Sequence, residues 1–351
     1  MRSLLFIPGH SARMMAKAAG SGADVVILDL EDAVHPDSKP AARRLVAEAL
    51  ANRSGATPAH YVRVNALDSV WCADDVEAVM PARPDGIMLP KPQGPEDLYR
   101  LDALMTRCEL SGATTGIIAV CTETPAATLS LAAKSWIHPR LAGLLRGGED
   151  LSAAIGTTAN RDEQGRYTEP FALARNLCLL AARAAGVVPI DAVFTDFRNV
   201  DGLTREADAA RRDGFSAKAA IHPAQVEIIN RCFTPTDGER RWAERVLAAF
   251  EASDSGVVQI DGVMMDAPHL SQARRRHGLA FALSERQTVT SREARRFGGG
   301  ALELIDHLAF GQGDRTEWHG KADILRQKFY LDLADTNFAG ERMVAAIAAL
   351  R

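Results

Sequence analysis

Short apolar runs recur through the first two thirds of this chain, and segments of helical composition separate most of them. Each run is rich in Val, Ile, Leu or Phe and is bounded by Gly, Pro or charge, which is typical of buried parallel strands. In chain order the eight runs are SLLFIPG, DVVILDLE, YVRVNA, GIMLPK, GIIAVCTE, LAGLLRGG, DAVFTD and SAKAAIHP. Eight strands alternating with helices over about 220 residues predict a (β/α)8 barrel, or TIM barrel, of the α/β class.

The segments between the runs favour the same fold. Helical composition is clearest in KPAARRLVAEALAN after the second run, PEDLYRLDALMTRCEL after the fourth and EPFALARNLCLLAARAAG after the sixth. A doubly wound open sheet is the alternative. The sequence contains no G-x-G-x-x-G after the first strand and no G-x-x-x-x-G-K-[ST], so it lacks the usual nucleotide-binding fingerprints.

The pattern changes after the eighth run. Two helical segments, PAQVEIINRCF and GERRWAERVLAAFEA, precede a β-like pair, GVVQI and GVMMD, which Asp261-Gly262 divides. We therefore predict three parts. These are a catalytic barrel over residues 1–235, a C-terminal helix and lid-like segment over 236–280, and a helical tail of unassigned role over 281–351.

Charge and hydropathy argue against two classes of partner. The net charge is −4 and basic residues are scattered among acidic ones, so no face predicts contact with nucleic acid. Nowhere do about 18 apolar residues follow one another without interruption, and the start MRSLLFIPGH holds a run too short for a signal peptide. We expect a cytoplasmic protein that acts on a small molecule and contacts neither nucleic acid nor membrane.

The five cysteines are odd in number and widely spaced, and none forms a C-x-x-C pair. This spacing argues against a disulfide framework and against a structural zinc site. We expect reduced thiols in the core.

Charged or polar residues lie on or just after most of the predicted strands. In chain order they are Asp29, Glu31, Asp32, Arg63, Lys91, Glu123, Asp150, Asp196 and His222. Because the strands of such a barrel point their carboxyl ends at one face, we expect these side chains to converge there. Carboxylates that converge in a site of low dielectric repel one another unless a cation lies among them.

Carboxylate ligands without Cys and with few His favour a hard ion, so we predict Mg²⁺, for which Mn²⁺ is an acceptable substitute. Glu123 and Asp150 are the predicted metal ligands. The alternative for each is a solvated loop acid or a helix N-cap. We place Asp29, Glu31, Asp32 and Lys91 around the ion without direct contact to it.

Arg63 lies between Val62 and Val64 in a predicted strand, so it points to the opposite face from these valines. An Arg in a barrel interior needs an anion, and its planar fork suits the carboxylate of a 2-oxo or 2-hydroxy acid. The alternative is a structural ion pair with Glu31 or Asp32. Lys91 in LPKP suits phosphate or a Schiff base, but a metal site makes the Schiff base redundant.

Taken together, these stretches resemble the citrate lyase β-subunit-like group of the HpcH/HpaI aldolase superfamily, which includes malyl-CoA, citramalyl-CoA and citryl-CoA lyases. The resemblance covers roughly residues 2 to 275. It depends on these motifs in this order: RSLLFIPG, GADVVILDLEDAVHPDSKPAAR, VRVNA, DGIMLPK, TETPAA, GGEDLSAAIG, DAVFTDFRNVDGL, KAAIHPAQ and GVMMDAPHL.

The resemblance implies Mg²⁺ ligation by Glu123 and Asp150, and it implies that Arg63 and Glu123 bind substrate. It adds Asp266, which matches an acid/base residue that related lyases place over a neighbouring subunit's barrel from a C-terminal lid. A homotrimer or homohexamer is the expected assembly. By sequence alone, Asp266 reads as a hairpin or turn residue.

The resemblance also implies that Phe6 and Lys17 contact coenzyme A. Related enzymes commonly have Arg-Pro near the phosphates of this ligand, whereas this chain has Ser11-Ala12. Arg13 is the nearby residue that would substitute.

The implied reaction is Mg²⁺-dependent cleavage or formation of a carboxylated 3-hydroxyacyl-CoA, such as malyl-CoA, citramalyl-CoA or citryl-CoA, with a 2-oxo acid and an acyl-CoA as products. The enzymatic alternatives are a malate-synthase-like condensation, a malyl-CoA thioesterase and a CoA-independent aldolase acting on hydroxy-oxo acids. An alternative of another class is a citrate lyase subunit that works only with an acyl carrier protein.

Overall fold

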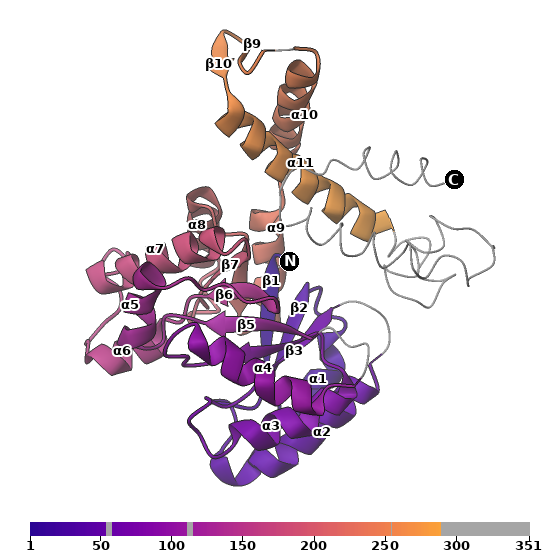
Figure 1. Cartoon of the computed structure of the whole chain (residues 1–351), viewed down its shortest axis with the longest axis vertical. Helices are drawn as coiled ribbons and strands as arrows, with labels where there is room; N and C mark the ends of the chain where they lie inside the picture. The colour runs from indigo at the N-terminus through magenta and orange to yellow at the C-terminus, as the bar shows by residue number, and fades with distance from the viewer. Residues whose placement is uncertain (54–57, 111–114, 254, 289–351) are drawn as a thin grey trace, which may run out of the picture. The chain divides into compact units, whose positions relative to one another are not determined.

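The computed structural model describes residues 1–53, 58–110, 115–253 and 255–288 of the 351-residue chain (Figure 1). The chain divides into a first compact unit, Met1–Phe233, and a second unit that begins at Thr234. Of the predicted helical tail, residues 289–351 lie outside the described residues. The division into a barrel, a lid segment and a tail therefore stays a prediction.

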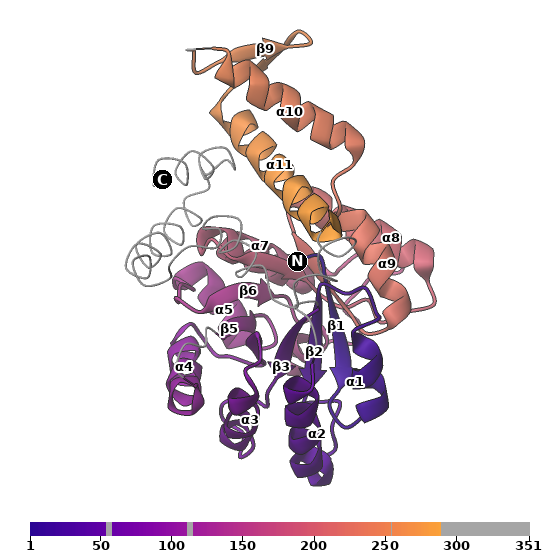
Figure 2. The same ribbon diagram turned by 90° about the vertical axis from the view of Figure 1, so that its right-hand side faces the viewer.

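The first unit is a closed barrel of eight parallel strands in chain order, in which β1 pairs with both β2 and β8. Figure 2 shows β1, β2 and β3 side by side. The strands are β1 (Ser3–Pro8), β2 (Val25–Asp29), β3 (Ala59–Arg63), β4 (Gly86–Leu89), β5 (Gly116–Val120), β6 (Leu141–Leu145), β7 (Val188–Asp191) and β8 (Ala217–Ala220). The predicted (β/α)8 barrel is confirmed, and the doubly wound sheet is excluded.

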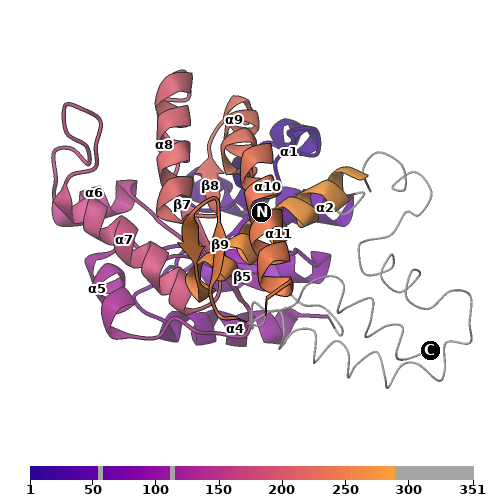
Figure 3. The ribbon, with the colours of Figure 1, turned by 90° about the horizontal axis from the view of Figure 1, so that it is seen from above.

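Helices surround the barrel, and Figure 3 shows α4, α5, α7 and α8 in succession around its outside. The helices are α1 (Ala12–Ala18), α2 (Lys39–Ala51), α3 (Cys72–Val79), α4 (Glu96–Cys108), α5 (Pro125–Ala133), α6 (Glu149–Ile155), α7 (Glu169–Ala184), α8 (Val200–Asp213) and α9 (Pro223–Phe233), with short 3-10 turns at Pro36–Ser38 and Met80–Ala82. The three helical segments quoted from the sequence correspond to α2, α4 and α7.

The seventh strand lies earlier than the sequence predicted. It is Val188–Asp191, whereas the predicted run begins at Asp191 and ends at Asp196. Pro189 has no N–H and so weakens the strand signal, but its carbonyl accepts a hydrogen bond from the N–H of Ser216 at 3.1 Å. Asp191, and not Asp196, therefore ends the strand.

Side chains alternate between the barrel interior and the layer under the helices, as β3 illustrates. Val62 and Val64 belong to the apolar layer between strands and helices, while Tyr61 belongs to the interior cluster. The guanidinium carbon of Arg63 lies 5.0 Å from the ring centre of Phe6, which packs against that interior cluster. The prediction that Arg63 points inward is confirmed.

The second unit contains α10 (Asp237–Glu251), a hairpin of β9 (Val258–Ile260) and β10 (Val263–Met265), and α11 (Ala267–Thr288). Thr236 and Glu239 form a capping box at the start of α10. Asp261 and Gly262 join the strands with φ values of 51° and 79°, which suit a two-residue hairpin turn. The expected pair split by Asp261-Gly262 is confirmed. No helix among the described residues is both long enough and apolar enough to cross a membrane.

All five cysteines are free thiols, and Cys108 is the one that is not buried. Burial raises the pKa of Cys72 to about 12 and that of Cys232 to about 11, which suppresses their thiolates. We predict that an aromatic disulfide reagent labels Cys108 rapidly in the native protein and the other four thiols only after denaturation. Cys108→Ser is expected to remove the fast phase. A second rapidly labelled thiol would contradict the burial pattern.

Candidate active site

The carboxyl ends of the strands surround a cavity of about 340 Å³ in the first unit. Residues from different strands and the loops after them line it. They include Phe6, Pro8, Asp29, Asp32, Arg63, Val120, Glu123, Arg146, Gly147, Gly148, Glu149, Asp150, Ala192 and Ile221. Because these residues lie far apart in sequence, the barrel itself creates the site.

Arg63, the last residue of β3, is held by acids from β2 and the loop after it. Its Nε and one terminal nitrogen donate to the two carboxylate oxygens of Asp29, each at 2.7 Å. The other terminal nitrogen lies 2.8 Å from a carboxylate oxygen of Glu31. Burial alone would lower the pKa of Arg63, but the hydrogen bonds and charge of Asp29 outweigh it and raise that pKa. The alternative prediction of an ion pair with Glu31 is therefore realised, and Asp29 is a further partner.

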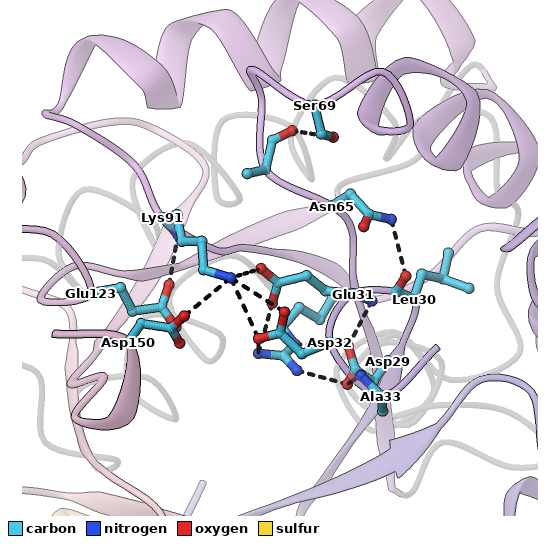
Figure 4. A network of polar contacts seen from close by, with 12 residues as sticks. Asp29, Leu30, Glu31, Asp32, Ala33, Asn65, Ser69, Lys91, Glu123 and Asp150 are labelled. Atoms are coloured by element: carbon cyan, nitrogen blue, oxygen red, sulfur yellow. Dashed lines mark hydrogen bonds and ion pairs between the residues drawn. The ribbon is translucent and has the colours of Figure 1, made fainter. Parts of the chain in front are cut away.

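Lys91 lies at the centre of the polar network (Figure 4). Its ammonium nitrogen is 2.7 Å from Glu31, 3.3 Å from Asp32 and 3.2 Å from Asp150. Burial would lower the pKa of Lys91, but hydrogen bonding to Glu31 outweighs it and raises that pKa. An ammonium held this firmly in its charged form is a poor Schiff-base nucleophile.

The backbone of Lys91 is unusual. Its φ is 49°, in the left-handed region that few residues other than glycine adopt. In this conformation its N–H donates to a carboxylate oxygen of Glu123 at 2.6 Å, while its side chain reaches Glu31. A residue that contacts of its backbone and of its side chain hold in a rare backbone conformation is typical of functional sites.

Glu123, which follows β5, is almost fully buried. Burial, followed by the charges of Glu31 and Asp150, raises its pKa to about 8. The loop after β6 passes so close that a Cβ on Gly147 would lie 2.4 Å from the Cγ of Glu123. Glycine is therefore required at position 147 for the β6 loop to approach this carboxyl group.

The charges of the site fit a divalent cation. The network contains five carboxyl groups and two cationic side chains, namely Asp29, Glu31, Asp32, Glu123 and Asp150 with Arg63 and Lys91. Glu123 joins it through the backbone N–H of Lys91. A carboxyl group whose pKa is raised by neighbouring acids is stabilised as an anion when a metal ion binds.

Few protein ligands are available for such an ion. Among the described residues, no group of three or more His, Cys, Asp or Glu side chains is arranged to hold a metal. Glu123 and Asp150 would supply two carboxylates, and oxygens of water and substrate would supply the remaining ligands. This mixed coordination is usual for Mg²⁺.

Of the other predicted site residues, one lines the cavity and the others do not. Phe6 lines the cavity beneath Arg63, whereas Lys17 lies in the last turn of α1 with an exposed side chain and is absent from the cavity lining. Ser11 is the N-cap of α1 and accepts from the N–H of Met14. Asp266 belongs to the second unit, where it precedes α11.

The structure contains a second cluster of buried charged residues, which the sequence patterns did not predict. Asp191 and Lys218 are fully buried, with their charged atoms 3.4 Å apart, and Arg146 lies 3.3 Å from Asp191. Glu206 of α8 accepts from Lys218 at 2.7 Å. Arg146 directly precedes Gly147 and Gly148, which lead into α6, and Asp150 lies in the first turn of that helix. The available signal was a lone Lys in the apolar run of β8.

The fold and this site define a parallel barrel with an acid-rich, cation-attracting centre at its carboxyl face. The chain belongs to the HpcH/HpaI aldolase/citrate lyase family, whose model matches residues 2–223. The family predicted from the motifs is therefore confirmed.

Several relatives resemble the chain over most of its length. It is 37% identical over 286 residues to a (3S)-malyl-CoA thioesterase of Cereibacter sphaeroides, which covers 81% of this chain and 95% of the relative. It is 32% identical over 306 residues to the mitochondrial citramalyl-CoA lyase of Rattus norvegicus, covering 81% and 87%. It is 35% identical over 280 residues to the citrate lyase subunit beta of Escherichia coli, covering 78% and 91%.

The fold of the chain is also similar to that of a solved structure. The protein CitE of Mycobacterium tuberculosis, in complex with magnesium, acetoacetate and coenzyme A, superposes with a TM-score of 0.64 at 33% identity. The match covers 79% of this chain and 98% of that protein.

Proposed function

We propose that this protein is a Mg²⁺-dependent carbon–carbon lyase that cleaves or forms a carboxylated 3-hydroxyacyl-CoA, with a 2-oxo acid and an acyl-CoA as products. The observation that carries the proposal is the convergence of Glu123 and Asp150 on Lys91 at the mouth of the barrel. Relatives named as citramalyl-CoA lyase and citrate lyase subunit beta support the same reaction class. The CitE complex with magnesium and coenzyme A supports the cofactor and the thioester.

Glu123 and Asp150 would hold the ion, which supplies polarisation of the substrate's hydroxyl and carboxylate oxygens when bound. Arg63 would bind the substrate carboxylate. Two of its five N–H groups donate to Asp29, and one terminal nitrogen forms an ion pair with Glu31, so further N–H groups remain for the substrate. Asp29 and Glu31 thus fix the orientation of the guanidinium before substrate arrives.

Phe6 and Lys17 would contact coenzyme A, and Asp266 would exchange a proton with the carbon next to the thioester. In this proposal Asp266 reaches a neighbouring subunit's barrel from residues 236–280, which makes a homotrimer or homohexamer the working form. The family resemblance supports these roles.

Thioester hydrolysis is the second candidate, because the chain is 37% identical to a (3S)-malyl-CoA thioesterase. Incubation with malyl-CoA, citramalyl-CoA and citryl-CoA, with Mg²⁺ or with EDTA, separates the two. A lyase releases a 2-oxo acid and no free thiol, whereas a thioesterase releases free CoA thiol and a hydroxy acid. We expect Mg²⁺-dependent release of the 2-oxo acid.

Release of free thiol alone would replace the lyase proposal with hydrolysis. Turnover that appears only with thioesters of an acyl carrier protein would indicate a carrier-dependent subunit. Turnover of free hydroxy-oxo acids would indicate a CoA-independent aldolase.

A further inference from the structure

Asp266 and His269 form a side-chain pair at the start of α11. The Nδ1 atom of His269 lies 2.6 Å from Oδ1 of Asp266, and the two side chains are 39% and 52% exposed. A ring nitrogen and a carboxylate oxygen at this distance share a proton. When Asp266 is ionised, Nδ1 of His269 must therefore carry the hydrogen and donate it.

The carboxylate of Asp266 does not cap the helix in the usual way. An Asp before a helix normally accepts from the backbone N–H of the second or third helical residue. Here the second residue is Pro268, which has no N–H, and the N–H of His269 donates to the backbone oxygen of Asp266 at 3.0 Å. The sequence DAPH thus leaves the carboxylate for the ring of His269.

We propose that His269 is the positioning residue of Asp266, an inference that depends on the proposed function of Asp266 as the acid/base group. Donation from Nδ1 fixes Oδ1 and leaves Oδ2 for the substrate. In the condensing direction, Oδ2 takes a proton from the methyl carbon of an acyl-CoA, and the C–H electron pair moves into the enolate. The Nδ1–H bond holds the carboxyl group in the orientation that this transfer needs.

A purely structural role for His269 is the competing explanation. In the other tautomer, Nδ1 of His269 accepts from the backbone N–H of Asp266 at 3.3 Å and donates nothing to Oδ1, an arrangement like a capping box with His in place of Glu. Two substitutions separate the roles. His269→Glu keeps an acceptor for that N–H but offers Oδ1 no donor, whereas His269→Asn places an amide N–H near the position of Nδ1.

The test follows deuterium uptake from D₂O into the methyl group of acetyl-CoA by mass spectrometry. Full-length protein, Mg²⁺ and oxalate, a 2-oxo acid analogue that cannot condense, are present. We expect His269→Glu to slow uptake by about 10²-fold, since a misplaced catalytic group costs about that much. His269→Asn should stay within about tenfold of wild type, with the KM for acetyl-CoA and the thermal stability unchanged in both variants.

Uptake by His269→Glu at the wild-type rate would overturn the positioning role and leave His269 as a cap. Wild-type protein that takes up no deuterium would overturn the proposed function itself, and the role of His269 with it. Asp266→Asn serves as the reference. It should lose uptake while keeping the Mg²⁺-induced rise in melting temperature.

Discussion

Replacement of Glu123 by Gln is expected to abolish Mg²⁺-dependent turnover. The substitution preserves the shape of the side chain but removes one of two carboxylates available to the ion. A metal contributes several kcal/mol of transition-state stabilisation, so kcat/KM should fall by about 10³-fold or more. Turnover of the described thioesters with saturating Mg²⁺ measures this loss.

The stability of the folded protein should not fall in the Glu123→Gln variant, in contrast to its turnover. The pKa of Glu123 is raised from its ordinary value to about 8, so its ionised form destabilises the folded protein. Without divalent cations, the stability that the neutral carboxyl group of Glu123 contributes to the folded protein is fully present below its ordinary pKa. This stability is lost as pH rises through about 8. The Gln variant should lack this dependence and melt no lower than wild type at pH 8.

The matched control is Glu109→Gln. Glu109 is also a largely buried acid, but it pairs with Arg140 and Thr115 at the amino end of β5, away from the strand ends that form the site. This variant should keep the wild-type kcat/KM and the Mg²⁺-induced rise in melting temperature. Near-normal turnover by Glu123→Gln, or a Mg²⁺ response equal to that of the control, would contradict the metal assignment.

Local sequence patterns predicted the barrel because each strand and helix carries its own signal. The rule that polar groups gather at the carboxyl ends of strands then identified Glu123, Asp150 and Lys91 without any knowledge of their contacts. Alternation along β3 correctly turned Arg63 inward. These predictions needed only the order of elements and the period of a strand.

Contacts between strands could not be predicted in the same way. Asp29 binds Arg63 because the two are register partners across β2 and β3, and register depends on pairing between distant segments. The left-handed backbone of Lys91 results from contacts with Glu123 and Glu31, neither of which is local in sequence. By contrast, the pair of Asp266 and His269 is local, and its i, i+3 spacing before a helix was a readable signal.

Of the substitutions proposed for this protein, Asp191→Asn is expected to lower the free energy of unfolding the most. Burial alone raises the pKa of Asp191, but the charges of Lys218, Arg146 and Arg175 outweigh it and hold that pKa well below its usual range. The ionised Asp191 therefore stabilises the folded protein. This stabilisation is fully present above the ordinary pKa of Asp and is lost as pH falls toward the lowered pKa of Asp191. Removing the charge leaves the fully buried ammonium of Lys218 without one of its two acids.

Breaking a buried ion pair by removing one partner costs about 3–5 kcal/mol of unfolding free energy, which denaturant titration at pH 7 measures. The matched control is Asp213→Asn, because Asp213 also pairs with Arg175 but is 40% exposed, and such pairs contribute about 0–1 kcal/mol. Asp191→Asn combined with Lys218→Met should recover part of the loss, since no uncompensated ammonium remains. Equal losses for Asp191→Asn and Asp213→Asn would show that the cluster of Asp191, Lys218 and Arg146 contributes no more than a surface pair.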